Sequence, residues 1–188
     1  MKELRPYLRE LIHFTDEEEE LFTSLFSELH LKKHDYFAQE GEYSSKLAFL
    51  SAGVMRAFFR NSFGNEYNKT FFTPPTFVAA YSSVTTKQKN LINIQCLTEC
   101  SLLVADFDKV SSLYKDFSKI ESLARILAEH KFAIKEKREI ELVTLEAKER
   151  YDIFKQEHPG LENQISQYHI ASYLGVSPTQ LSRIRAKK

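Results

Sequence analysis

The chain has 188 residues, of which 43% are hydrophobic and 28% are charged, and its formal net charge at pH 7 is zero. This length can fold as one large domain or two small ones, and the composition is typical of a folded soluble protein. No apolar run approaches the ~20 residues that a membrane-spanning helix needs, and the acidic N-terminal segment lacks the apolar core of a signal peptide. We therefore expect a cytoplasmic protein with no membrane partner.

Two cysteines, Cys96 and Cys100, are too few for a disulfide framework or a four-cysteine metal site. They flank Leu-Thr-Glu, the predicted turn of a hairpin, so the two thiols could face each other as a redox pair. Two buried thiols are the favoured alternative in a cytosolic β-core. The six histidines show no metal-binding grouping, and no catalytic motif is present. We expect no metal, no cofactor and no enzyme activity.

The first predicted helix begins at a capping motif. In Thr15-Asp16-Glu17-Glu18 the threonine side chain can accept a hydrogen bond from the backbone N–H of Glu18, and the Glu18 carboxylate can reach back. Apolar residues follow at helical spacing, namely Leu21, Phe22, Leu25, Phe26 and Leu29. The pattern predicts an amphipathic helix over Thr15–His30.

From about residue 31 to 113 the chain consists of short runs rich in β-branched and aromatic residues. Turn signals separate these runs at Gly41, Gly53, "NSFGNE" (61–66) and "TPP" (73–75). The pattern predicts an all-β sandwich or barrel with strands every 8–12 residues. The loop at 61–66 is typical of a hairpin in which Gly64 takes a positive φ.

The segment Asp116–Leu145 contains no proline or glycine and predicts one long helix. Its apolar residues form two neighbouring rows, Ile120, Leu123, Leu127 and Ile134 in one and Ile126, Ala133 and Ile140 in the other. A helix about 40 Å long is longer than a small β-domain needs for cover. We expect it to pair with its copy in a second subunit; the alternative is that it packs on its own chain. Residues 142–147 would form a hinge before another helix at 148–160.

The last predicted elements are two short helices joined by a turn. The first covers Ile165–Leu174 with Ser166 as its N-cap, and Gly175 can close it in a left-handed conformation. Ser177-Pro178-Thr179-Gln180 then starts the second helix, because serine is a strong cap, proline suits the first helical position and glutamine completes a capping box. Two helices around a short glycine turn form the helix-turn-helix pattern, whose second helix enters the DNA major groove.

The charge and chemistry of this end favour DNA binding. The segment from Ile165 to Lys188 has four basic residues and no acids, so it carries +4 and the rest of the chain −4. Arg183 can bind guanine O6 and N7, Gln180 can bind adenine N6 and N7, and Thr179 can contact a thymine methyl. Ser172 and the terminal lysines can bind phosphates. The alternative is a helical hairpin with a solvated, lysine-rich end. The predicted DNA-binding residues are Ser177, Thr179, Gln180, Ser182, Arg183, Arg185, Lys187 and Lys188.

The order of acidic helix start, β-domain, long helix and helix-turn-helix resembles the Crp/Fnr family of bacterial transcription regulators over nearly all of the chain. The segments "ASYLGVSPTQLSRIR" and "AKERYDIF" are similar to the branch of the family common in Bacteroidetes, and Gly41 and Gly53 match the family's glycine spacing. The resemblance implies an α+β fold with an N-terminal β-roll (jelly-roll, cyclic-nucleotide-binding-like) domain at 1–115, a long dimerisation helix at 116–145 and a C-terminal helix-turn-helix domain at 146–188.

The resemblance also implies a homodimer that binds double-stranded DNA at an inverted repeat, with RNA polymerase as a partner. In relatives that bind cyclic AMP, a phosphate-binding cassette carries Gly-Glu at its start and Arg-Ser near its end. Ala79-Ala80 and Asn90-Leu91 stand at these positions here, and an uncharged asparagine cannot make the charged contact that arginine makes with a phosphate. We expect no cyclic AMP binding, and an effector that is unidentified or none. The predicted pocket residues are Ala79, Ala80, Tyr81, Ser82, Lys89 and Asn90.

The sequence departs from the family pattern after the second terminal helix. Only Ala186-Lys187-Lys188 follow it, where many relatives have a β-hairpin wing, so the wing is missing or the chain is shortened. The competing interpretation is a β-roll module that binds a small ligand or a protein and whose terminal helices only pack. DNA affinity that falls steeply with salt would distinguish a regulator from such a module.

Overall fold

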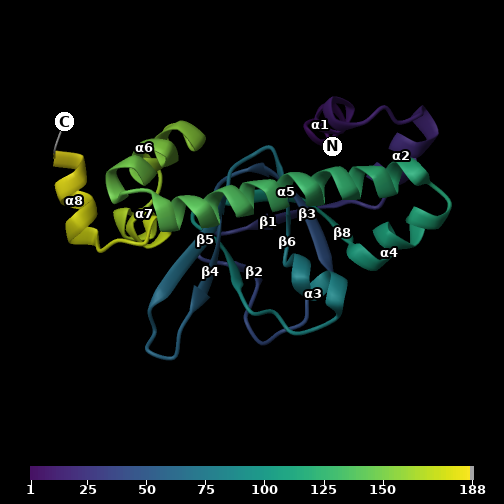
Figure 1. Ribbon diagram of the computed structural model, residues 1–188. Helices are drawn as coiled ribbons and strands as arrows, with labels where there is room; N and C mark the ends of the chain where they lie inside the picture. Colours follow the sequence, from purple (N-terminus) through teal and green to yellow (C-terminus); the bar gives the residue numbers. More distant parts are fainter. Residues whose placement is uncertain (187–188) are drawn as a thin grey trace. The chain divides into compact units, whose positions relative to one another are not determined.

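The strands follow two N-terminal helices and precede the long helix and the C-terminal helices (Figure 1). The computed structural model describes residues 1–186. The helices are α1 (Leu4–Leu11), α2 (Asp16–Ser24), α3 (Tyr81–Thr86), α4 (Phe107–Ser112), α5 (Ser118–Thr144), α6 (Ala147–Glu157), α7 (Gln167–Leu174) and α8 (Pro178–Ala186), with 3-10 turns η1 (Leu113–Lys115) and η2 (Leu161–Asn163). The strands are β1 (Ser27–Leu31), β2 (Tyr36–Ala38), β3 (Lys46–Ala52), β4 (Met55–Arg60), β5 (Glu66–Phe72), β6 (Thr76–Ala79), β7 (Asn93–Cys96) and β8 (Cys100–Asp106).

The chain packs as two compact units. The first contains Met1–Ala57 and Phe71–His130, and the second contains Phe58–Thr70 and the described chain from Lys131 to Ala186. Three elements, β4, β5 and α5, run from one unit into the other. The β4–β5 hairpin tip therefore belongs to the same unit as α6, α7 and α8.

The strands form two four-stranded sheets, with orders β1-β8-β3-β6 and β2-β7-β4-β5. In the first sheet β3 pairs antiparallel with both neighbours, so that Ala48 lies opposite Val104 on β8 and Val78 on β6. Because side chains alternate along a strand, Ala48 and Leu50 join a core cluster with Met55 and Ile94 of the second sheet. This confirms the predicted α+β class with a β-sandwich.

The opposite face of β3 is covered by helices. Phe49 joins Leu4 and Leu8 of α1, Phe22 of α2 and Ile120 of α5 in a second core cluster. Aromatic contacts strengthen this cluster, since the rings of Phe22 and Phe26 and of Phe49 and Phe77 lie 5.3 and 5.4 Å apart. Helix α1 has no counterpart among the predicted elements.

The capping box at Thr15 and Glu18 is confirmed, but the helix it starts is shorter than predicted. Helix α2 ends at Ser24, and the residues from Ser27 form β1, which pairs antiparallel with β8. The prediction of one helix to His30 was wrong because Leu29 fits both a helical and a strand pattern. The pairing with β8, seventy residues later, decides between them.

Helix α5 confirms the predicted long helix and has two distinct halves. Ile120 and Leu123 are buried in the core of the first unit, so this half packs on its own chain. From 131 to 137 every side chain is exposed. Within residues 1–186 no helix combines the length and apolarity required to cross a membrane.

The two cysteines lie next to each other, but not across a hairpin. Strand β7 belongs to one sheet and β8 to the other, so Leu97–Glu99 connects two sheets. Both thiols are free and buried. The hydrogen bond with Cys100, together with burial, raises the pKa of Cys96 above its usual range. These observations confirm the expectation of two buried thiols and correct the predicted turn.

Candidate nucleic-acid interface

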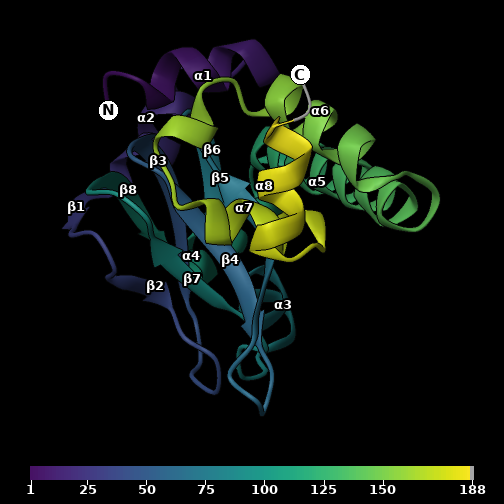
Figure 2. The ribbon, with the colours of Figure 1, turned by 90° about the vertical axis from the view of Figure 1, so that its left-hand side faces the viewer.

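The helix pair α7–α8 forms where the sequence predicts it (Figure 2). The side chain of Ser166 accepts a hydrogen bond from the backbone N–H of Tyr168 at 3.3 Å and caps α7. Gly175 closes the helix with a φ of 68°, in the left-handed region that favours glycine. Val176 and Ser177 then complete a short link to α8.

A complete capping box starts α8. The backbone N–H of Gln180 donates to Ser177 Oγ at 3.2 Å, and the Ser177 N–H donates to Gln180 Oε1 at 2.9 Å. Pro178 occupies the first helical position, where a missing N–H costs nothing. Leu181 is buried, with 1% of its surface exposed, and Ile184 is half-buried. These two residues anchor one face of α8 and leave the other to solvent.

The exposed face of α8 carries the predicted DNA-binding residues. The predicted residues exposed within residues 1–186 are Ser177, Thr179, Gln180, Ser182, Arg183 and Arg185. Lys187 and Lys188 lie outside the described residues. No residue of α8 is acidic, and its two arginines lie in the last turn, where they suit the negative end of the helix dipole. The surface offers hydrogen-bond donors and positive charge to a polyanion.

The side chains on this face differ in the contacts that they already make within the chain. The amide oxygen of Gln180 is engaged by the Ser177 N–H, so a bidentate contact with adenine would have to share or break the cap. Arg185 lies beside the hydroxyl of Tyr151, which donates to Glu162 at 2.5 Å. Burial and the bond to Glu162 raise the pKa of Tyr151, and Arg185 opposes that shift. Thr179 and Arg183 are the exposed candidates that we carry forward as base readers.

Two arginines for which the sequence predicts no role hold α7 in place. Arg150 of α6 donates to the Leu174 carbonyl at 3.1 Å and to the Leu145 carbonyl at 2.7 Å. Arg138 of α5 donates to the Tyr173 carbonyl, and its guanidinium lies 3.4 Å from the centroid of the Tyr173 ring. The C-terminal carbonyls of α7 are thereby capped by α5 and α6. No local motif signals this role, because a basic residue in a helix usually faces solvent.

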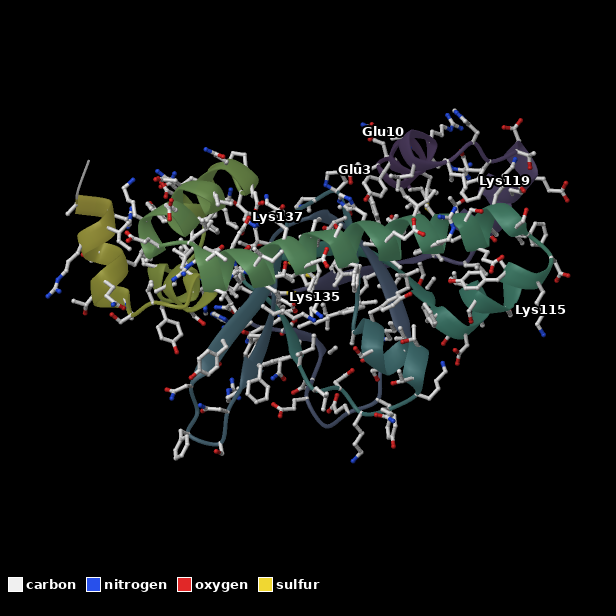
Figure 3. All side chains as sticks on the ribbon, viewed as in Figure 1. Glu3, Glu10, Lys115, Lys119, Lys135 and Lys137 are labelled. Atoms are coloured by element: carbon white, nitrogen blue, oxygen red, sulfur yellow. The ribbon has the colours of Figure 1, made fainter. Side chains whose placement is uncertain are left out.

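Salt bridges lie along the second half of α5, and one of them reaches α6. Lys135 and Lys137 project from this half (Figure 3). Lys137 Nζ lies 2.7 Å from a carboxylate oxygen of Glu157 on α6, and Lys135 Nζ lies 3.2 Å from Glu139 on its own helix. Such exposed pairs contribute about 0–1 kcal/mol each, so the arginine contacts are the firmer connection between α5, α6 and α7.

The predicted effector-pocket residues differ in burial and in the contacts that they make. Asn90 is buried and donates to the Gln39 carbonyl and to Ser44 Oγ, both at 2.9 Å. Ala79 is half-buried and Ala80 is buried, whereas Tyr81 and Ser82 are exposed on α3 and Lys89 lies over the Tyr43 ring at 6.0 Å. Asn90, one of the predicted pocket residues, is therefore a buried side chain that is hydrogen-bonded within the chain.

A separate open groove of about 430 Å³ lies between α3, α4 and α5 in the first unit. Its lining includes Tyr81, Val84, Phe107, Tyr114, Ala124 and Ala128. Of the predicted pocket residues only Tyr81 lines it. Lys87 and Asp108, which also line it, form an ion pair. Among residues 1–186 no cluster of three histidine, cysteine or acidic side chains could bind a metal.

No family model matches the sequence, and no curated protein matches it. Solved structures share its fold. FixK2 from Bradyrhizobium japonicum matches with a TM-score of 0.76 at 16% identity, over 86% of this chain and 83% of that one. A Crp/Fnr-family regulator from Eubacterium rectale matches with a TM-score of 0.72 at 15% identity, over 91% and 82%. The c-di-GMP-responsive regulator CLP from Xanthomonas campestris matches with a TM-score of 0.72 at 14% identity, over 89% and 88%. The chain has a Crp/Fnr-like fold.

Proposed function

We propose that this chain is a DNA-binding transcription regulator of the Crp/Fnr type, in which α7 and α8 act as a helix-turn-helix. The observation that carries the proposal is the exposed, carboxylate-free face of α8 behind a complete capping box. A complete cap fixes the start of α8, and the second helix of a helix-turn-helix lies in the major groove. The fold shared with known regulators supports the same assignment.

Within this proposal the residues of α8 have different roles. Arg183 is the base reader, since two N–H groups of its guanidinium can donate to guanine O6 and N7. Thr179 contacts a thymine methyl. Ser177 and Ser182 lie at the same surface and suit phosphate oxygens. Arg185, which is partly engaged with Tyr151, supplies charge more than sequence information. Lys187 and Lys188 would add phosphate contacts.

We further propose the three-part division of the chain into a β-roll at 1–115, a dimerisation helix at 116–145 and a DNA-binding domain at 146–188. The β-roll does not bind cyclic AMP in this proposal. Asn90 stands where the cassette arginine would pair with the phosphate, and both of its amide hydrogens already bind Gln39 and Ser44. The protein acts in the cytoplasm as a homodimer, with RNA polymerase as its partner at promoters.

The test is selection of bound duplexes from a random DNA pool, followed by measurement of affinity against salt. We expect enrichment of an inverted repeat and a logarithmic affinity that falls linearly with the logarithm of salt concentration, with a slope of roughly −0.9 for each phosphate neutralised. A pool that shows no enrichment, together with an affinity that does not change with salt concentration, would reject DNA binding. That result would favour the alternative, a β-roll module that binds a small ligand or a protein.

A further inference from the structure

Strand β5 lies at the edge of its sheet, next to β4. An edge strand leaves a row of backbone N–H and C=O groups without a partner strand, and these groups need other partners. The carbonyl of Glu66 and the N–H of Asn68 point to the same side of β5, because residues two apart in a strand share a direction. The structure shows what binds this pair.

The partner is one hydroxyl group on α7. Ser172 Oγ donates to the Glu66 carbonyl at 2.6 Å and accepts from the Asn68 N–H at 3.0 Å. One side chain thus satisfies both backbone groups, as a neighbouring strand would. These residues are more than a hundred positions apart in the chain, and all lie in the second unit.

A second contact fixes the same two elements. The side-chain amide of Asn68, which is 5% exposed, donates to the carbonyl of His169 at 3.0 Å. His169 and Ser172 are three residues apart, so they lie on one face of α7. Across the hairpin, Arg60 pairs with the Glu66 carboxylate at 2.7 Å and links the two strands. We call the contact among Glu66, Asn68, His169 and Ser172 the hairpin latch.

We infer that the hairpin latch positions α7, and through it α8, for DNA, with Asn68 and Ser172 as the positioning residues. This inference rests on the proposed function. The latch engages α7 and leaves the outer face of α8 exposed, so it holds the reading helix ready and does not mask it. A helix already held in its binding position loses less conformational entropy when it binds.

The latch lies within the second unit, and the strands of the hairpin run on into the sheet of the β-roll. Strands β4 and β5 belong to the sheet of the β-roll and continue into the hairpin tip. A change in the register or twist of these strands would move Glu66 and Asn68 together. Because both are bonded to α7, the change would reach the helix pair through three hydrogen bonds.

The first arm of the test needs no DNA. Ser172→Ala removes the hydroxyl and leaves a good helix former in α7. We expect amide hydrogen exchange at Asn68 and along α7 to accelerate together by about tenfold, since one lost hydrogen bond changes local stability by that order. Ser112→Ala is the matched control, because that hydroxyl bonds to the Lys109 carbonyl within its own helix, α4. Unchanged exchange at Asn68 and α7 would overturn the latch.

The second arm measures DNA binding of the full chain. We expect Ser172→Ala and Asn68→Ala each to lower affinity for the selected duplex several-fold without altering the preferred sequence, and the double variant to be no weaker than the weaker single variant. Effects that multiply in the double variant, or faster exchange with unchanged affinity, would overturn the positioning role. If the unaltered protein binds no DNA, the proposed function fails and, with it, the positioning role; the exchange arm then decides only whether the hairpin holds α7.

Discussion

At the scale of single residues, Arg183 and Arg185 lie on one helix but have different surroundings. Arg185 lies beside Tyr151, whereas Arg183 is exposed at the surface that we assign to DNA. We expect Arg183→Ala to cost about 1–3 kcal/mol of binding free energy at one base position and to relax sequence choice there. Competition among duplexes with single base substitutions measures this loss.

Arg185→Ala is the matched control for that experiment, because it removes the same charge two residues away. We expect it to weaken all duplexes by a similar factor and to reduce the salt slope by about 1. An unchanged preference at every base position in Arg183→Ala would argue that this arginine reads no base.

Gly53 and Gly41 provide a matched pair for the stability of the β-roll. Both have positive φ, +94° and +83°. A Cβ at Gly53 would lie 2.2 Å from the Glu99 carbonyl oxygen and 2.8 Å from Cys100 Sγ, whereas one at Gly41 would meet nothing within 4 Å. We expect Gly41→Ala to cost about 1–2 kcal/mol of unfolding free energy through the backbone alone. Gly53→Ala should cost a further 1–3 kcal/mol, roughly, from the clash. Equal losses in chemical denaturation would contradict this account.

At the scale of elements, the capping box of α8 combines stability with recognition in one side chain. Gln180 accepts a hydrogen bond from Ser177 and also faces the proposed DNA surface. Gln180→Glu preserves the box and adds a negative charge in the first turn, where the helix dipole favours it. We expect an unchanged or higher Tm and an affinity for DNA at least about tenfold weaker, because the new carboxylate faces phosphates.

Gln180→Ala separates the effect on stability from the effect of charge on DNA binding, since it removes the cap acceptor without adding charge. It should lower Tm and weaken DNA binding less than Gln180→Glu does. Thermal unfolding and DNA titration of both variants give the two readouts. If Gln180→Glu bound DNA as tightly as the unaltered protein, the first turn of α8 would not face DNA.

The elements also show which parts of the structure are readable from sequence. The caps at Thr15, Ser166 and Ser177 were predicted correctly because a few neighbouring residues determine each of them. The extension of the first helix to His30 failed because β1 exists only through its pairing with β8. The latch at Ser172 was missed for the same reason, since nothing near a serine in a helix indicates an edge strand a hundred residues away. The predicted partner of this serine was a phosphate, whereas its hydroxyl binds the β5 backbone.

At the scale of the whole molecule, the second half of α5 is the surface that the single chain leaves unexplained. Its exposed large apolar side chains are Phe132, Ile134, Ile140, Leu142 and Val143. By helical periodicity Phe132, Ile140 and Val143 share one side of the helix, whereas Ile134 lies on the other, and exposed apolar clusters are common interaction surfaces. Pairing of two copies along this side of α5 would bury these three residues and present two copies of α8, as the proposed inverted-repeat site requires.

We therefore expect the double variant Ile140→Glu, Val143→Glu to be folded but monomeric. In the single chain these side chains are 57% and 86% exposed, so charging them costs the fold little, whereas burying two carboxylates in a dimer interface is strongly unfavourable. Sedimentation measures the mass, and footprinting should show two half-sites about 34 Å apart for the unaltered protein and one for the variant. Phe63→Glu, at an 88% exposed position of the hairpin tip, controls for a general effect of replacing an exposed apolar residue. A variant that remains dimeric would place the subunit interface elsewhere than on this half of α5.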